Sequence, residues 1–251
     1  MVQYTEWRSI SDGSIISSIP DVLVDNFEDS QDVDGAEEPF GIYGPDEDLS
    51  DYYKGDLANY ARTTDDPAIG DYALEWQSNQ NLRYDTVVIS EPGDGLPNYP
   101  EQEDTIRCLL RDFSGPESRL GPAVVFNADY DAGEDEVDGY AVGIDNDQNE
   151  IKIWKLDGFN AIAESDRQKL AGESTTIDTD TWYWIEADLV DESGNIEGRV
   201  YGYDESENER DGLKATVTTT DTDISPSNRG IGWFKRDDSP GTAYDELFIV
   251  D

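Results

Sequence analysis

Acidic side chains at alternate positions of one predicted strand are the first candidates for chemistry. The segment EADLVD runs from Glu186 to Asp191, and the period of two in a strand places Glu186 and Asp188 on one face with Trp184. Two carboxylates facing one cleft can carry out glycoside hydrolysis. Asp and Glu make up nearly a quarter of the chain, so this spacing also arises by chance. We favour a solvated face and predict no catalytic residue.

Three side chains in one predicted turn are spaced like calcium ligands. Asp145, Asp147 and Asn149 stand at alternate positions, as at the start of a calcium-binding loop. The glycine and the distal glutamate of such a loop do not follow at the required spacing, so we favour an ordinary hairpin turn. The sequence contains no histidine, which excludes His-based triads, imidazole bases and the most common zinc ligand.

Aromatic side chains in the predicted strands are candidates for stacking on sugar rings. Tyr140, Trp154, Trp184 and Tyr201 lie in separate strands and can share one sheet face. Such a face would bind a glycan, because the apolar C–H faces of sugars pack on aromatic rings. The alternative, which we favour, is that these rings cover the second face of a sandwich sheet, as aromatics commonly do.

The charge balance indicates the solvent in which the protein folds. The 251 residues include 59 acidic and 17 basic side chains, for a formal net charge of -42. Repulsion of this size opposes a compact state at low ionic strength, whereas at about 1 M salt the Debye length falls to about 3 Å and screens most of it. Arginine also outnumbers lysine, whose long aliphatic stem is a poor surface group in brine. We therefore expect a halophilic protein.

The same composition excludes several kinds of partner. Phosphate binding needs clustered Lys and Arg, which are missing, so we expect no nucleic-acid partner. No segment approaches the roughly 20 apolar residues of a membrane span, so we expect no membrane insertion. The single cysteine, Cys108, lies in an apolar stretch and is expected to be a buried thiol.

Short strands separated by acidic turns dominate the chain and predict an all-β antiparallel β-sandwich. Helical periodicity is scarce, and its longest candidate, Ala161 to Ala171, could equally be a loop between strands. Turn sequences at Asp145 to Asn149, Asp191 to Asn195 and Asp237 to Gly241 join neighbouring strands. The expected strands are Tyr72 to Gln77, Thr86 to Ser90, Thr105 to Asp112, Ala123 to Asn127, Gly139 to Asp145, Glu150 to Leu156, Thr181 to Val190, Asn195 to Tyr203, Lys214 to Thr219, Gly230 to Lys235 and Tyr244 to Val250.

The sequence predicts one domain with an additional arm. Residues 1–20 have neither the basic nor the apolar region of a signal peptide, and they read as an N-terminal arm for anchoring or oligomer contact. Residues 21–251 would form the sandwich. Two acidic segments with Pro and Gly, Asp29 to Asp51 and Glu91 to Asp104, are expected to be long loops, which often carry function.

Five segments in order resemble the concanavalin A-like jelly roll in its laminin-G-like form. They are DNFED at Asp25 to Asp29, GDYALEW at Gly70 to Trp76, DGYAVGID at Asp138 to Asp145, TWYWIEADLVDESGNIEGRVY at Thr181 to Tyr201 and RGIGWFKRDDSPGTAYDELFIV at Arg229 to Val250. In that family the first and last strands lie side by side. Relative to it, residues 30–47 look like an acidic loop insertion, where specialised contacts would be expected.

The resemblance also implies candidate site residues. Jelly rolls of this type often bind a cation where the first and last strands meet, and Glu28 and Asp245 would then hold a structural Ca²⁺. The strand at 186–191 is similar to the paired-carboxylate strand of laminarinase-like hydrolases. It departs from that motif, since Ala187 occupies the second position and Asp191 stands where the motif has Glu. This departure weakens the expectation of hydrolysis.

Three functions remain open at this point. The chain resembles laminin-G-like proteins in tailed viruses of halophilic archaea, which favours a non-catalytic, homo-oligomeric virion surface protein in a capsid decoration, turret or tail. Such a protein would contact other virion proteins and bind a host-surface glycan. The first alternative is a glycoside hydrolase or carbohydrate-binding module of a halophilic archaeon, extracellular or cytoplasmic. The second is a capsid cement protein without a ligand.

Overall fold

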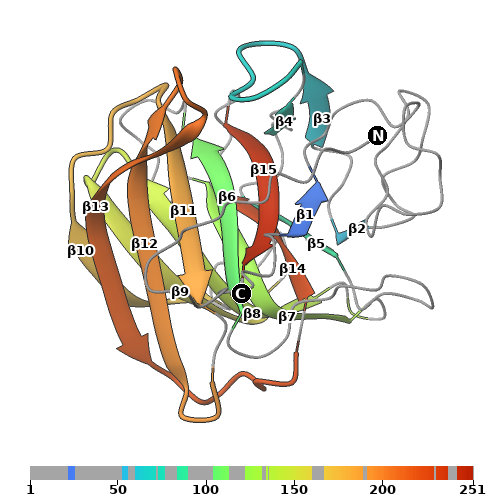
Figure 1. Cartoon of the computed structure of the whole chain (residues 1–251). Coiled ribbons are helices and arrows are strands. Elements are labelled where there is room, and N and C mark those ends of the chain that lie inside the picture. Colours follow the sequence, from blue (N-terminus) through green and yellow to red (C-terminus); the bar gives the residue numbers. More distant parts are fainter. Residues whose placement is uncertain are drawn as a thin grey trace, which may run out of the picture.

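Two antiparallel sheets packed face to face form the architecture in the computed structural model (Figure 1). The structure describes residues 22–25, 53–55, 60–71, 73–76, 84–89, 104–112, 122–131, 134, 136–159, 167–188, 191–228, 230–236 and 242–250. These residues contain strands and turns and no helix, and therefore no helix that could span a membrane. The predicted all-β sandwich is confirmed.

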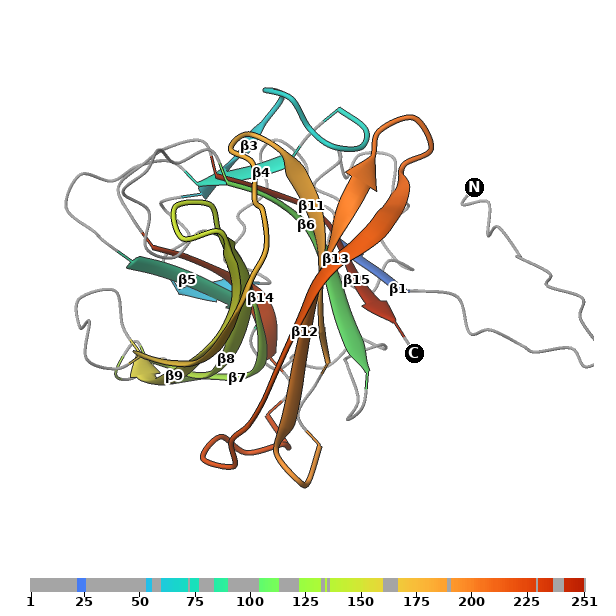
Figure 2. The ribbon, with the colours of Figure 1, turned by 90° about the vertical axis from the view of Figure 1, so that its left-hand side faces the viewer.

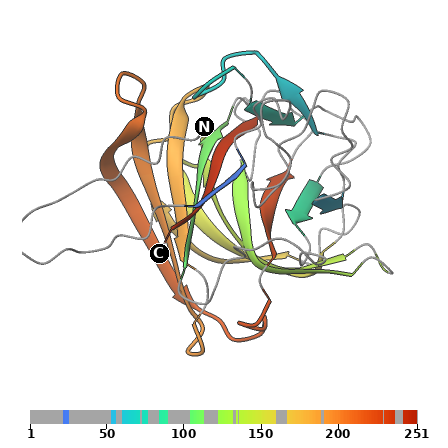
Figure 3. The same ribbon diagram turned by 45° about the vertical axis from the view of Figure 1, so that its right-hand side comes forward.

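Sheet A has eight described strands and contains both the first and the last strand of the chain. Its order is β13 (Glu209–Thr220), β12 (Asn195–Asp204), β11 (Trp182–Asp188), β6 (Thr105–Arg111), β15 (Ala243–Val250), β4 (Ala73–Trp76) and β3 (Tyr60–Thr63), with β1 (Val22–Asp25) also paired to β15. Figure 3 shows blue β1 beside red β15, as the resemblance implied.

Sheet B has seven described strands and lies across the core from sheet A, as Figure 2 shows. Its order is β10 (Arg167–Ser174), β9 (Glu150–Phe159), β8 (Glu136–Asp145), β7 (Ala123–Asp131), β14 (Gly230–Arg236), β5 (Tyr84–Ile89) and β2 (Tyr53–Gly55). Consecutive strands β14 and β15 belong to different sheets. β14 and β15 are therefore not paired with each other as a hairpin.

The main core fills the space between the sheets, and strand alternation explains which side chains enter it. Ile185 and Ala187 of β11 belong to this core with Val142 of β8 and Ile153 of β9. On each strand, the residues that alternate with these core positions point to the outer face of the sheet. Cys108 is completely buried in the same core, as predicted.

Each of the expected strands overlaps an observed one, but the candidate helix is wrong where the structure describes it. Residues 167–171 belong to β10, which pairs with β9 at the edge of sheet B. Leu170 and Ala171 pack against the core while most neighbouring side chains are exposed, so the strand is mainly polar. The arm at 1–20 and the insertion at 30–47 lie outside the described residues.

Candidate functional site

The outer face of sheet A carries the predicted carboxylate pair. Glu186 and Asp188 share this face with Trp184, because Ile185 and Ala187 point into the core between the sheets. The predicted face of strand β11 is therefore confirmed, but the predicted solvation is wrong at Glu186, which is 4% exposed because arginine side chains cover it. The same alternation places Glu197 and Arg199 of β12 on the outer face beside them, since Ile196 and Val200 enter the core.

Three arginines converge on Glu186. One carboxylate oxygen, Oε1, accepts Nε of Arg107 at 2.9 Å and Nη1 of Arg210, and Oε2 accepts Nε of Arg199 at 3.0 Å. Burial raises the pKa of the Glu186 carboxyl, but the charges of Arg107 and Arg210 outweigh it and hold the pKa below its usual range. Glu186 is therefore a bound anion and is poorly suited to donate a proton.

The second carboxylate, Asp188, is held in a similar way. Its two oxygens accept Nη2 and Nη1 of Arg199 at 2.5 and 3.0 Å, which is a bidentate ion pair. The hydroxyl of Thr105 donates to Asp188 at 2.7 Å, and Arg199 also reaches Glu197 at 2.5 Å. Glu186 and Asp188 thus share Arg199, so the pair forms one ion network.

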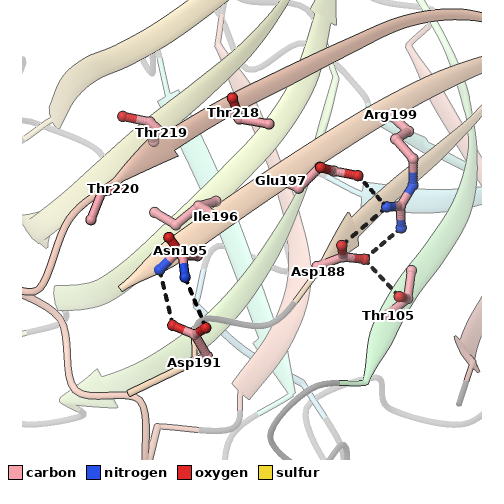
Figure 4. A pocket seen from close by; sticks show the side chains of 10 residues that line it. All are labelled: Thr105, Asp188, Asp191, Asn195, Ile196, Glu197, Arg199, Thr218, Thr219 and Thr220. Carbon is pink, nitrogen blue, oxygen red and sulfur yellow. Dashed lines mark hydrogen bonds and ion pairs between the residues drawn. The ribbon is translucent and has the colours of Figure 1, made fainter. Parts of the chain in front are cut away.

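A groove of about 700 Å³ lies at the end of this network, near the β11–β12 hairpin (Figure 4). It is lined by carboxylate, amide, guanidinium and hydroxyl groups together with one isoleucine. The lining residues are Thr105, Asp188, Asp191, Asn195, Ile196, Glu197, Arg199, Thr218, Thr219 and Thr220. Side chains of this kind can hydrogen-bond a polyhydroxylated ligand, and a volume between about 300 and 1,000 Å³ suits a small molecule.

The hairpin beside the groove is held by Asp191. Its Oδ1 accepts the backbone N–H of Ser193 at 2.8 Å and of Asn195 at 3.1 Å, and its Oδ2 accepts Nδ2 of Asn195 at 2.9 Å. Gly194 has φ of 73°, and a Cβ there would lie 2.2 Å from the carbonyl oxygen of Asp221. Glycine is therefore required for the turn to approach the chain that leaves β13.

The predicted aromatic platform is divided between different surfaces, so the prediction of one shared face is wrong. Trp184 and Tyr201 pair across β11 and β12 on the outer face of sheet A. Trp154 lies on the outer face of sheet B, in another apolar cluster. Tyr140 is completely buried between the sheets, where its hydroxyl donates to Asp221 at 2.7 Å. The four residues lie in two sheets, and within sheet B Tyr140 and Trp154 point to opposite faces because Ala141 is the residue that pairs with Trp154. Neither the sheet order nor the register can be read from the sequence.

The two aromatics on sheet A are also covered. Trp184 is 4% exposed and packs against Phe248 and Tyr203, with ring centroids 6.1 and 6.5 Å apart. The guanidinium of Arg210 lies 5.0 Å from the ring centroid of Tyr201. Trp184 and Tyr201 therefore pack against other side chains of the protein, which is the alternative that we favoured. Glycan contact by Trp154, Trp184 or Tyr201 stays a prediction.

The connection between β3 and β4, residues 64–71, lies against the aromatic end of this face. Ala68 and Ile69 pack against the same apolar cluster as Trp184. The hydroxyl of Tyr203 donates to the carbonyl of Ala68 at 2.7 Å, and Nη1 of Arg111 donates to the carbonyl of Asp66 at 3.0 Å. These bonds hold the connection on sheet A, over the aromatic end of its outer face.

Asp245, one of the two candidate calcium ligands, has other partners. Asp245 is buried, and its carboxylate accepts the backbone N–H groups of Ala68, Ile69 and Glu246 at 3.0, 3.1 and 2.9 Å. With its oxygens used in this way, Asp245 does not fit a cation ligand. Glu28 lies outside the described residues, and calcium bound through it stays a prediction. Within the described ranges no group of three or more His, Cys, Asp or Glu side chains could hold a metal.

The turn at Asp145 to Asn149 is a hairpin, as we favoured, and joins β8 to β9. Asp145 points into the protein, where its carboxylate pairs with the ammonium of Lys152 and accepts the backbone N–H of Gln148 at 2.9 Å. An ammonium thus supplies the positive charge for Asp145 that a calcium ion would otherwise bring.

The fold defines the class of this protein as an antiparallel β-sandwich of the jelly-roll type, and two solved structures are similar to it. One is the carbohydrate binding module CBM66 from Bacillus subtilis, with a TM-score of 0.50 and 15% identity over 79% of this chain and 95% of that chain. The other is the exoplasmic/lumenal domain of VIP36 in its Ca²⁺/Man3GlcNAc-bound form, with a TM-score of 0.51 and 11% identity over 78% and 81%. At these identities the similarity concerns the fold. No family model and no curated protein matches the sequence.

Sequence reasoning missed the arginines that define the site. Arg107, Arg199 and Arg210 come from strands β6, β12 and β13. They meet at Glu186 because β6 and β12 flank β11 in sheet A and β13 lies next to β12. A signal was present in the sequence, since arginine is scarce in this acidic chain. Arg107 and Arg199 each stand between apolar residues or glycines that alternate toward the core.

Proposed function

We propose that this protein is a non-catalytic glycan-binding jelly roll on the virion surface of a halophilic virus. The observation that carries the glycan part is the polar groove beside Asp188 and Arg199, whose carboxylate, amide and hydroxyl groups suit the hydroxyls of a sugar. The names of the two similar structures, a carbohydrate binding module and a glycan-bound lumenal domain, support the same class of ligand.

The ion network supports a binding role over hydrolysis. A glycosidase needs one carboxyl that keeps its proton until the leaving group takes it. Glu186 and Asp188 are both paired with arginine, and the pKa of Glu186 is lowered by those charges. Asp188 thus offers the groove a hydrogen-bond acceptor fixed by Arg199, and the lowered pKa of Glu186 makes it poorly suited to donate a proton.

The virion assignment rests on the resemblance to laminin-G-like proteins of tailed viruses and on the net charge of -42. Capsid decoration, turret and tail are the placements that we propose, with residues 1–20 making contacts to other virion proteins or to a second copy. The gene neighbourhood tests this part. Portal and major capsid genes nearby would support it, whereas polysaccharide-degrading enzymes nearby would favour a carbohydrate-binding module of the cell.

A glycan array in molar salt tests the groove. We expect the wild-type protein to bind a subset of glycans and Glu197→Ala to weaken that binding at least about tenfold, because it removes a charged acceptor. Glu205→Ala is the matched control, since Glu205 is an exposed turn residue at the other end of β12. An array without any bound glycan, together with stable self-assembly, would favour a capsid cement protein.

A further inference from the structure

The charged groups of the groove are unequal in number. Asp188, Asp191 and Glu197 contribute three carboxylates, and Arg199 contributes one guanidinium. Asp188 and Glu197 remain accessible, with side chains 33% and 38% exposed. A ligand in the groove therefore meets an excess of negative charge and of hydrogen-bond acceptors.

Arg199 does not compensate for this excess, because hydrogen bonds to carboxylates of the protein use four of its five N–H donors. Its Nε donates to Glu186, its Nη1 donates to Asp188 and Glu197, and its Nη2 donates to Asp188. Binding a carboxylate or sulfate ester with the planar fork of an arginine requires two parallel free N–H groups. Here an acidic ligand would have to break ion pairs that hold strands β11 and β12 together.

The hydroxyl groups of the groove fit the same conclusion. Thr105 donates its hydroxyl to Asp188 at 2.7 Å, which commits that proton within the protein. Thr218 lies directly opposite Glu197 in the strand register and is exposed. A ligand placed there meets the Glu197 carboxylate, which only accepts hydrogen bonds, and a neutral sugar hydroxyl can donate one to it.

From these contacts we infer that the groove selects glycans without acidic groups and rejects sulfated or uronic-acid forms of the same sugars. This selectivity rests on the proposed glycan-binding function. It arises from contact with the groove carboxylates and not from the net charge of the protein. In molar salt the Debye length is about 3 Å, so the distant charges are screened while those in contact with the ligand are not.

The test uses matched glycan pairs in molar salt, each a neutral oligosaccharide with its sulfated and uronic-acid forms. We expect the wild-type protein to bind the neutral member at least about tenfold more tightly than either acidic form. Equal or tighter binding of the acidic forms would overturn this inference and leave the proposed function standing. Binding of no glycan in any pair would overturn the proposed function and this inference with it.

A variant with an added charge tests whether the preference for neutral glycans arises in the groove. Thr218→Lys introduces a positive charge into the groove without removing an ion pair, and we expect it to reduce the preference for neutral glycans at least about fivefold. Thr176→Lys makes the same change at an exposed residue outside the groove and should leave the preference unchanged. Equal effects of the two variants would show that overall charge sets the preference, which would overturn the inference.

Discussion

The ammonium of Lys152 pairs with the carboxylate of Asp145 in the β8–β9 hairpin, and both side chains are almost completely buried, at 2% and 0% exposure. Gln148 donates its backbone N–H to the same aspartate and accepts a hydrogen bond from Lys152 at 3.0 Å. Every group in this small network has a partner within the hairpin. The β8–β9 connection is therefore held by an internal ion pair.

Removing one member of this pair is expected to destabilise the protein strongly. Lys152→Met leaves the Asp145 carboxylate buried without its cation, at a cost of about 3–5 kcal/mol in the free energy of unfolding. Denaturant unfolding in molar salt measures it. Lys169→Met is the matched control, because Lys169 is 37% exposed in its pair with Glu150 and should lose at most about 1 kcal/mol. Equal losses in the free energy of unfolding for Lys152→Met and Lys169→Met would contradict the view that burial makes the Lys152–Asp145 pair important for stability.

The arginine network predicts that Glu186 stabilises the fold and does not catalyse hydrolysis. Glu186→Gln keeps the shape of the side chain but leaves three guanidinium groups without their shared anion, and we expect a loss of about 2–3 kcal/mol. Glu197→Gln, at an exposed position, should lose at most about 1 kcal/mol. Hydrolysis of a glycan panel that is abolished by Glu186→Gln would contradict the binding role.

The raised pKa of Asp245 predicts that the free energy of unfolding decreases as the pH rises. Burial, with a contribution from the charge of Glu246, raises the pKa of its carboxyl from 3.8 to about 9, while the backbone N–H groups it accepts act in the opposite direction. Between these values the folded protein keeps a proton that the unfolded chain has released, so the stabilisation present at low pH is lost toward pH 9. The melting temperature, measured above pH 5 in molar salt, should therefore decline.

Asp245→Asn isolates this effect. The amide cannot ionise, so the decline of melting temperature with pH should become shallower, while the loss of one backbone hydrogen bond lowers stability by about 1 kcal/mol at every pH. Glu186 does not interfere in this range, because its lowered pKa removes stability only as the pH falls into the acid range. A variant with the same slope as the wild type would contradict the role of Asp245.

The net charge of -42 predicts a salt requirement. Raising the salt concentration from about 0.1 to about 1 M shortens the Debye length from about 10 to about 3 Å, so repulsion between surface carboxylates weakens and the melting temperature should rise. Thermal unfolding in a potassium chloride series measures this. Sucrose at matched osmolality serves as the control, since it does not screen charge. A melting temperature that is independent of salt would contradict a halophilic protein.

Most strands could be predicted because a half-buried strand records its burial in the alternation of its residues. Strand β11 shows this, since Tyr183, Ile185 and Ala187 enter the core and Glu186 does not. Strand β10 could not be predicted in the same way. It lies at a sheet edge and most of its side chains are exposed, so RQKLAGES carries no alternation of apolar residues.

The site could be predicted only in part, because its members are far apart along the chain. The carboxylates of Glu186 and Asp188 are two residues apart, and strand geometry alone places them on one face. Arg107 reaches Glu186 across 79 residues and Arg210 across 24. Their meeting depends on β6 and β13 lying in the same sheet as β11, which is a property of topology and register.

By itself, the sequence determined the β-sandwich class, the strand faces, the buried thiol of Cys108 and the acidic surface, since each depends on composition or on the period of two within a strand. The tertiary structure decided which charges meet. It paired Lys152 with Asp145, gave Glu186 three arginines, and moved Tyr140 into the core. Arg107 and Arg210 reach Glu186 because strands that are distant in the sequence lie in one sheet, whereas Lys152 and Asp145 meet within the β8–β9 hairpin. In a chain rich in carboxylates, the sheet order and register determine which few carboxylates lie together in a site.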